Sequence, residues 1–67
     1  MEFGKFFKEC RKQADLSQKE VAEKLGIHQS NISDWENNVS RPDYEKLIDL
    51  AKIYDVSIYQ LLGIEEF

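Results

Sequence analysis

The sequence is poor in residues that cross-link a fold or interrupt a helix. It has one cysteine, so no internal disulfide can form, and with a single histidine it has no Cys/His set for a zinc ion. One proline and three glycines leave few breaks, and no segment alternates β-branched residues as a strand would. These shortages predict an all-α fold held together by packing alone, without a metal or other cofactor.

Long apolar runs are also lacking. No stretch of about 18 apolar residues is present, and the first five residues lack the apolar core of a signal peptide, so we expect a cytoplasmic protein with no membrane partner. A chain of 67 residues buries only about 60% of the surface that it exposes when unfolded. We therefore expect one domain, residues 1–67, that binds a partner, rather than an enzyme or a protein with a small-molecule pocket.

The net charge is −4, which opposes binding to a phosphate backbone. The acidity is uneven, because residues 1–42 carry seven Lys or Arg and seven Asp or Glu, whereas residues 43–67 carry two and six. The objection to a nucleic-acid partner therefore applies mainly to the C-terminal third of the chain.

Apolar spacing and helix-end signals divide the chain into five short helices. Phe3, Phe7 and Cys10 recur at helical spacing and are predicted to form the inner face of the first helix. Asp15 can close that helix in the left-handed conformation. We expect Cys10, on the inner face, to be a buried and reduced thiol.

The second helix is predicted from about residue 18 to residue 25. Ser17 and Glu20 fit a capping box, in which the hydroxyl accepts from the third backbone amide and the carboxylate reaches back. Gly26 sits where a helix ends in a left-handed residue, and Ile27 fills the short turn that follows. A third helix is expected to start at once.

The third helix is predicted from about His28 to Asn37. Ile32 and Trp35, three residues apart, form its inner face, while most of its other positions are polar. Asn38 is a fair substitute for glycine in the left-handed cap. This pattern leaves a polar face of the helix exposed.

Two further helices are predicted within residues 43–62. Asp43 is a good N-cap for the fourth helix, and Ser57 for the fifth, which ends at Gly63. The inward-facing residues are predicted to be Tyr44, Leu47, Leu50, Ala51 and Tyr54 in the fourth helix and Leu61 and Leu62 in the fifth.

Residues 17–37 carry the informative pattern, two short helices separated by a turn at Gly26. The small side chain of Ala22 on the inner face lets the next helix cross closely and at a steep angle. That next helix is dense in Gln, Ser and Asn, whose amides can read adenine bidentately and whose hydroxyls adapt to either kind of base edge. The pattern suits insertion into the major groove of DNA.

Nearly the whole chain takes part in one ordered set of residues. The set comprises Gly4 and Arg11, then Leu16-Ser17-Gln18-x-Glu20-Val21-Ala22-x-x-Leu25-Gly26-Ile27, then Gln29-Ser30-x-Ile32-Ser33-x-Trp35-Glu36-Asn37, then Arg41-Pro42, Leu50-Ala51, Val56-Ser57 and Leu61-Leu62. At these spacings it resembles the Cro/CI-type (XRE-type) helix-turn-helix domains of phage repressors and small bacterial regulators, which have the lambda-repressor-like fold.

The resemblance implies a transcriptional regulator, a repressor, that binds double-stranded DNA sequence-specifically with the helix over residues 28–37. It implies that Gln18 bonds a phosphate and braces Gln29, and that Arg11 and Glu36 form a semi-buried ion pair. The positions implied to contact bases are Gln29, Ser30, Asn31, Ser33 and Asp34. Those implied to contact the DNA backbone are Ser17, Gln18, His28, Asn37 and Arg41.

Three residues depart from the family's pattern. His28 stands where Ser or Thr usually caps the recognition helix, and imidazole is a poorer cap. Val39 replaces a basic residue that often contacts phosphate. Asp34 places a carboxylate where Lys, Arg or Gln is common, and it can either accept from cytosine N4 or repel the duplex.

Apolar residues near the C-terminus suggest a second copy of the chain as a partner. Tyr59, Ile64 and Phe67 are candidates for an isologous dimer patch, and such a homodimer would match a palindromic operator.

One alternative function remains open because of the net acidity, Val39 and Asp34. It is a protein-interaction module on the same scaffold, antitoxin- or antirepressor-like, that binds a basic partner instead of DNA.

Overall fold

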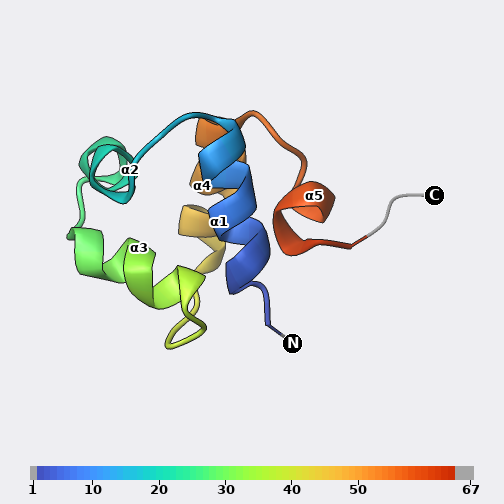
Figure 1. The fold of residues 1–67 in the computed structure, drawn as a ribbon, viewed down its shortest axis with the longest axis horizontal. Helices are drawn as coiled ribbons and strands as arrows, with labels where there is room; N and C mark the ends of the chain where they lie inside the picture. Colours follow the sequence, from blue (N-terminus) through green and yellow to red (C-terminus); the bar gives the residue numbers. More distant parts are fainter. Residues whose placement is uncertain (1, 65–67) are drawn as a thin grey trace.

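The computed structural model describes residues 2–64, which form five helices and no strand. The helices are α1 (Gly4–Gln13), α2 (Gln18–Leu25), α3 (Gln29–Glu36), α4 (Tyr44–Tyr54) and α5 (Ile58–Leu62), as Figure 1 shows. The predicted all-α class is confirmed. Phe67, one of the predicted dimer residues, lies outside the described residues. None of the described helices is long and apolar enough to cross a membrane.

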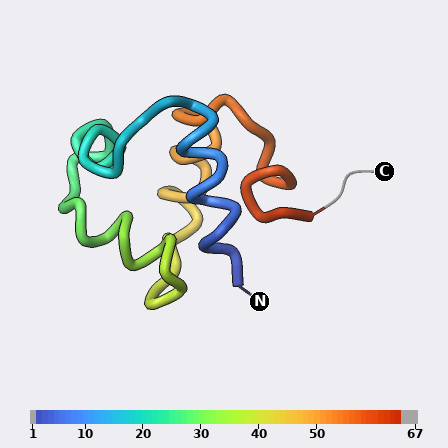
Figure 2. The backbone as a smooth tube through the Cα atoms, viewed as in Figure 1, coloured from blue at the N-terminus to red at the C-terminus, as the bar shows by residue number. Residues whose placement is uncertain are grey.

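α1 lies at the centre of the molecule, with the other helices around it. α2 and α3 lie on one side of α1, α5 lies on the other side, and α4 lies behind it in the view of Figures 1 and 2. α1 contacts α3, α4 and α5, while α2 contacts α3 and α4. The pair of helices α2 and α3 therefore forms one edge of the molecule, away from α5.

The ends of the first three helices form as the local sequence signals predict. Ser17 Oγ accepts from the Glu20 amide at 3.0 Å, and Glu20 Oε1 accepts from the Ser17 amide at 3.0 Å, so both halves of the capping box are present. Asp15, Gly26 and Asn38 take left-handed conformations, with φ values of 58°, 69° and 62°. Short-range interactions thus fix both ends of α2 and the end of α3.

α4 and α5 also start at their predicted caps. Asp43 Oδ1 accepts from the Lys46 amide at 2.8 Å, and Ser57 Oγ accepts from the Gln60 amide at 3.0 Å. Gln60 Oε1 accepts from the Ser57 amide at 2.9 Å and completes a second capping box. α5 ends at Gly63, which has a φ of 70°.

The core gathers side chains from all five helices. Val21, Ile32, Leu50 and Leu61 are its largest fully buried side chains. The other buried apolar residues are Phe7, Cys10, Ala22, Trp35, Ala51 and Tyr54. Among the described residues, the buried charged ones are Arg11 and Glu36, so a charged pair is part of the interior.

Tyr44 departs from the predicted inner stripe of α4. Its side chain is 87% exposed, so the prediction that it is buried is wrong. Helical side chains lean toward the N-terminus of their helix, and Tyr44 is the first residue of α4, so its ring lies beyond the end of the packed stripe. The stripe therefore begins one turn later, at the half-buried Leu47.

Candidate nucleic-acid interface

α2 and α3 are joined by a turn of three residues. Gly26 ends α2 with a φ of 69°, and the amide of Ile27 donates to the carbonyl of Ala22 at 3.0 Å. Ala22 on α2 and Ile32 on α3 are both buried. Because the small side chain of Ala22 lets α3 approach closely, one face of α3 packs against α2 and the opposite face remains outside.

The outward face of α3 is polar. Ile32, Trp35 and Glu36 are the buried residues of this helix. The five predicted base-contacting residues lie off that face: Gln29, Ser30 and Asn31 are exposed, and Ser33 and Asp34 are half-buried. Ser33 Oγ accepts from Asn37 Nδ2 at 3.2 Å, one turn further along. The face therefore presents a short row of amide and hydroxyl groups with one carboxylate.

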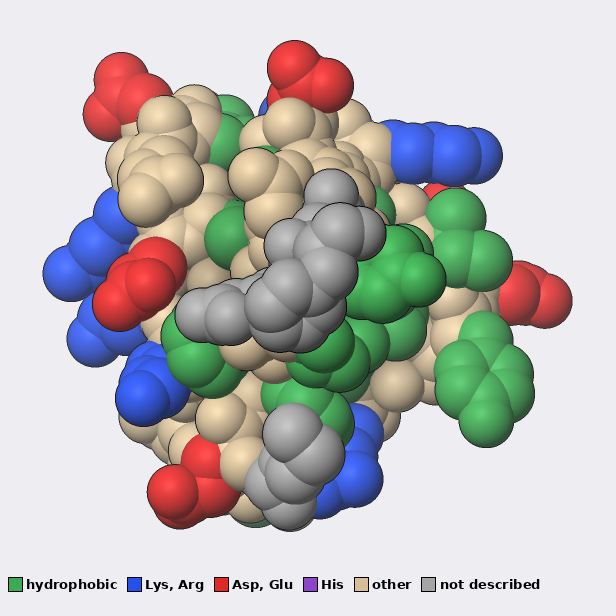
Figure 3. All heavy atoms as spheres, turned by 90° about the vertical axis from the view of Figure 1, so that its right-hand side faces the viewer, with side chains coloured by type: hydrophobic (Ala, Val, Ile, Leu, Met, Phe, Trp, Pro, Cys, Tyr) green, Lys and Arg blue, Asp and Glu red, His purple; other side chains and the backbone are tan. Residues whose placement is uncertain are grey.

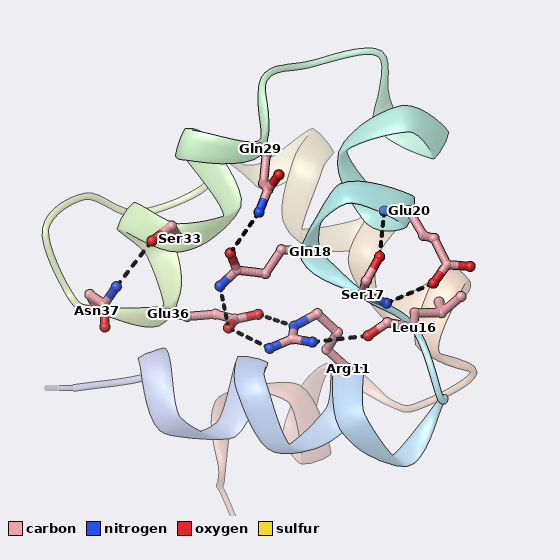
Figure 4. A network of polar contacts seen from close by, with 9 residues as sticks. All are labelled: Arg11, Leu16, Ser17, Gln18, Glu20, Gln29, Ser33, Glu36 and Asn37. Carbon is pink, nitrogen blue, oxygen red and sulfur yellow. Dashed lines mark hydrogen bonds and ion pairs between the residues drawn. The ribbon is translucent and has the colours of Figure 1, made fainter.

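A buried ion pair joins α1 to the end of α3, as Figure 4 shows. Arg11 Nε donates to Glu36 Oε2 at 2.6 Å, and Arg11 Nη2 donates to Glu36 Oε1 at 3.0 Å. Arg11 Nη1 donates to the carbonyl of Leu16 at 2.9 Å. The hydrogen bond to Glu36 raises the pKa of Arg11 and keeps the buried guanidinium charged. This pair fixes the orientation of α3 relative to α1.

Gln18, the first residue of α2, connects the ion pair to the outward face of α3. Its Nε2 donates to Glu36 Oε1 at 3.0 Å, and its Oε1 accepts from Gln29 Nε2 at 3.4 Å (Figure 4). The structure thus brings Gln18 and Gln29 together, as the resemblance implies. The bond from Gln18 to Glu36 was not predicted. The sequence offered one indication of this bond, because a Glu36 carboxylate paired with Arg11 still has lone pairs that can accept from another donor.

The residues predicted to contact the DNA backbone lie at the ends of α2 and α3, except Arg41, which lies in the loop before α4. Ser17, His28, Asn37 and Arg41 are exposed, and Gln18 is half-buried. The hydroxyl of Ser17 accepts from the Glu20 amide, so it can offer a phosphate only its own hydroxyl hydrogen. The His28 side chain makes no cap hydrogen bond to α3, in agreement with the poor capping ability of imidazole.

The loop between α3 and α4 carries an exposed apolar residue beside a basic one. Val39 is 72% exposed. The Arg41 guanidinium lies over the ring of Phe3, with its carbon 5.4 Å from the ring centroid. This cation–π contact positions the Arg41 side chain against the start of α1.

Comparison with known proteins decides the family. A family model described as helix-turn-helix matches residues 7–61, which include the whole of α2, α3 and α4. The chain belongs to this helix-turn-helix family.

The domain is similar to regulators from two bacteria. The HTH-type transcriptional regulator ImmR of Bacillus subtilis (strain 168) is 44% identical over 66 residues, which are 98% of this chain and 52% of ImmR. The uncharacterized HTH-type transcriptional regulator YqaE of the same organism is 42% identical over 60 residues, 90% of this chain and 52% of YqaE. The HTH-type transcriptional activator BcrR of Enterococcus faecalis is 35% identical over 66 residues, 98% of this chain and 32% of BcrR. The chain spans about half the length of ImmR and YqaE and about a third of BcrR.

The helix-turn-helix domain has a second, apolar surface on the side where α5 lies. Tyr59 and Ile64, two of the predicted dimer residues, are exposed there to 54% and 43%. Figure 3 shows hydrophobic side chains gathered on this side of the molecule. A groove of about 220 Å³ is lined in part by Tyr44, Leu47 and Leu62. Two of the three predicted dimer residues, Tyr59 and Ile64, therefore lie on exposed apolar surface.

Sequence reasoning missed two exposed apolar residues of α4. Tyr44 is exposed for the reason given above, and Ile48, one turn later, is also exposed. Ile48 lies off the buried stripe through Leu50 and Ala51, so helical spacing alone could have identified it. Tyr44 also lines the groove of the apolar surface, whereas Ile48 adds exposed apolar area to α4.

Proposed function

We propose that this domain binds double-stranded DNA sequence-specifically, as the DNA-binding part of a transcriptional regulator, with α3 as its recognition helix. The observation that carries the proposal is the outward polar face of α3, whose first residue, Gln29, hydrogen-bonds to Gln18 on α2. An exposed helix of this kind fits the major groove, where amides and hydroxyls read base edges. The names of ImmR, YqaE and BcrR, all HTH-type regulators of transcription, support the same class of function.

Base readout is assigned to the outward residues of α3. Gln29 lies in the first turn, where its amide can donate to adenine N7 and accept from adenine N6. Asp34 fits a cytosine, because the N4 amine of cytosine donates to a carboxylate. The proposed base-contacting set is Gln29, Ser30, Asn31, Ser33 and Asp34.

Anchoring to the phosphate backbone is assigned to groups at the ends of α2 and α3. The first turn of a helix carries backbone amides without partners inside the helix, and such amides favour anions. The proposed side-chain contacts are Ser17, Gln18, His28, Asn37 and Arg41. Because the first 42 residues are neutral overall, affinity in this proposal depends on the placement of these few groups rather than on a basic surface.

A homodimer on a palindromic operator is part of the same proposal. Tyr59 and Ile64 expose apolar surface, and an isologous contact would cover this patch on both copies at once. Sedimentation of the chain at millimolar concentration tests the contact. We expect a dimer that Tyr59→Glu shifts toward monomer. If the parent chain sediments only as a monomer, this apolar patch does not drive dimerisation. Dimerisation would then depend on the operator or on a part of the protein outside this chain.

Repression is the proposed direction of regulation, and the cytoplasm, where bacterial DNA lies, is the proposed location. A domain seated in the major groove of a promoter excludes the polymerase by occupying its site. A reporter gene with the selected operator inside its promoter should be expressed less when the protein is present. Higher expression would assign activation instead, the direction that the name of BcrR gives for that relative.

Selection of binding sites from a random pool of DNA duplexes tests the central proposal. We expect a palindromic site to be enriched, and affinity for it to fall steeply with salt concentration. Lys52→Ala, an exposed change on α4, is the control and should leave the selected site unchanged. If no site is enriched and a mixed duplex is not bound even at low salt, DNA binding is excluded.

A protein-interaction module is the second candidate function. The observations that favour it are the net charge of −4 and the exposure of Val39 where a phosphate-binding residue would be useful. Such a module would bind a basic protein partner through its acidic surface. It predicts no affinity for mixed duplex DNA at low salt, whereas a DNA-binding domain retains weak nonspecific affinity that salt abolishes.

A further inference from the structure

Four side chains form one continuous chain of hydrogen bonds from the interior to the outward face of α3. Arg11 donates to both carboxylate oxygens of Glu36, and Gln18 Nε2 donates to Glu36 Oε1 at 3.0 Å. Gln29 Nε2 then donates to Gln18 Oε1 at 3.4 Å (Figure 4). The chain begins at a buried charge pair and ends at an exposed amide.

The order of donors and acceptors in this chain is determined at its buried end. A carboxylate can only accept hydrogen bonds, and a guanidinium can only donate them. Glu36 therefore requires the nitrogen of the Gln18 amide, and the oxygen of that amide is left to face Gln29. Gln29 must in turn direct its own nitrogen toward Gln18, although the side chain of a free glutamine can present either end.

We infer that the buried carboxylate of Glu36 sets, through Gln18, the amide orientation of Gln29 and thereby selects the base that Gln29 prefers. This inference rests on the proposed function of α3 in the major groove. A glutamine reads adenine by donating to N7 and accepting from N6, so reversing its amide reverses the order of donor and acceptor that it can match. Glu36 is a positioning residue that acts on sequence preference without reaching the DNA.

The test compares variants that remove or replace single links of the chain. R11M/E36M removes the buried ion pair that orients the Gln18 amide. An apolar pair of similar volume is often tolerated in place of a buried ion pair. Q18A removes the link between the interior and Gln29. Q18E offers Gln29 an acceptor that needs no help from Glu36, because a carboxylate accepts in either orientation. The triple variant R11M/E36M/Q18E lacks the ion pair but offers Gln29 the new carboxylate as an acceptor.

The measurement is a ratio of dissociation constants for each variant. One duplex is the site selected from the random pool, and the other carries a substitution at the base pair whose preference Gln29→Ala abolishes. The parent should discriminate by about tenfold, as one bidentate contact allows. We expect R11M/E36M and Q18A to bring the ratio close to one, and the triple variant to return it to the parent's value. An added carboxylate near phosphate weakens binding to both duplexes, so it cancels from the ratio.

Selectivity at neighbouring base pairs is the internal control, because a variant that merely loosens the fold would lower discrimination at every position. The inference is overturned if R11M/E36M keeps the parent's ratio, or if the triple variant does not restore it. Should R11M/E36M fail to fold, Q18A decides, since the inference requires Q18A to lose discrimination at the base pair that Gln29 reads and to keep it at the neighbouring base pairs. Absence of selective binding by the parent would instead refute the proposed function, and the inference with it.

Discussion

Gly4 at the start of α1 packs directly against the carbonyl of Glu36 at the end of α3. A Cβ atom built on Gly4 would overlap with the backbone oxygen of Glu36 and crowd that of Trp35, neither of which can move like a side chain. The amide of Gly4 also donates to Asn38 Oδ1 at 2.9 Å. This contact sets how closely α1 approaches the C-terminal end of α3.

The first prediction is that Gly4→Ala destabilises the domain. Alanine is the better helix former by about 0.5–1 kcal/mol, but the overlap forces α1 and α3 apart, which typically costs about 1–3 kcal/mol. We expect a net loss in the free energy of unfolding, measured by urea denaturation. Lys5→Ala, an exposed change at the next position, should stay within about 0.5 kcal/mol of the parent. A Gly4→Ala variant as stable as the parent would contradict the close approach of the two backbones.

The second prediction concerns the coupling of Arg11 and Glu36. Removing one partner leaves the other charge buried without its counterpart, so Arg11→Met and Glu36→Met should each cost about 3–5 kcal/mol. The double variant should be more stable than either single one, because no lone charge remains inside. A double-mutant cycle from thermal or urea unfolding measures this coupling. Additive losses would mean that the two side chains are not paired in solution.

Local chemistry explains why the sequence predicted the helix ends well. The capping box of Ser17 and Glu20 and the left-handed residues Asp15, Gly26 and Asn38 each involve groups only a few positions apart. Their geometry follows from short-range interactions that any context preserves. The same reasoning failed at Tyr44, because apolar periodicity identifies a face of a helix but does not show where the core beneath that face ends.

The polar network was predictable only in pieces. The resemblance implied a pair of Arg11 with Glu36 and a contact of Gln18 with Gln29, and each involves two residues. The bond from Gln18 to Glu36 that joins them depends on how α1, α2 and α3 meet in space. No spacing in the sequence encodes a distance across three elements, so the continuous chain of bonds became visible only in the structure.

The third prediction is that the free energy of unfolding falls at alkaline pH because of the buried phenol of Tyr54. Burial raises the pKa of this phenol well above its usual value, and the nearby Glu36 charge adds to the effect. Below pH 10 both the folded and the unfolded chain hold the proton. Above pH 10 the unfolded chain releases it while the folded chain retains it, so the free energy of unfolding falls by up to about 1.4 kcal/mol per pH unit.

Tyr54→Phe removes this titration and retains the ring. Unfolding of both proteins is followed by urea denaturation from pH 8 to about pH 11.5, above the ordinary tyrosine pKa of about 10. The difference between the two free energies should be constant up to about pH 10, and above it the parent should lose stability relative to the variant. Lysine titration affects both proteins alike and cancels. Parallel curves throughout would show that the Tyr54 phenol is not buried as the structure places it.

The last prediction separates base readout from backbone anchoring within the proposed DNA interface. Gln29→Ala should cost about 1–3 kcal/mol on the selected operator and relax selectivity at one base pair in each half-site, because it removes a bidentate amide from the first turn of α3. Arg41→Ala should weaken binding to all duplexes alike and lower the salt dependence by about one unit, because it removes a charge that we propose contacts phosphate. Both variants are titrated against operator and scrambled duplexes at several salt concentrations, at a temperature where each is fully folded, since Arg41→Ala also removes the contact with Phe3. If Gln29→Ala loses affinity equally on both duplexes, or loses none, α3 does not read bases through this residue, and the protein-interaction function becomes the better account of the domain.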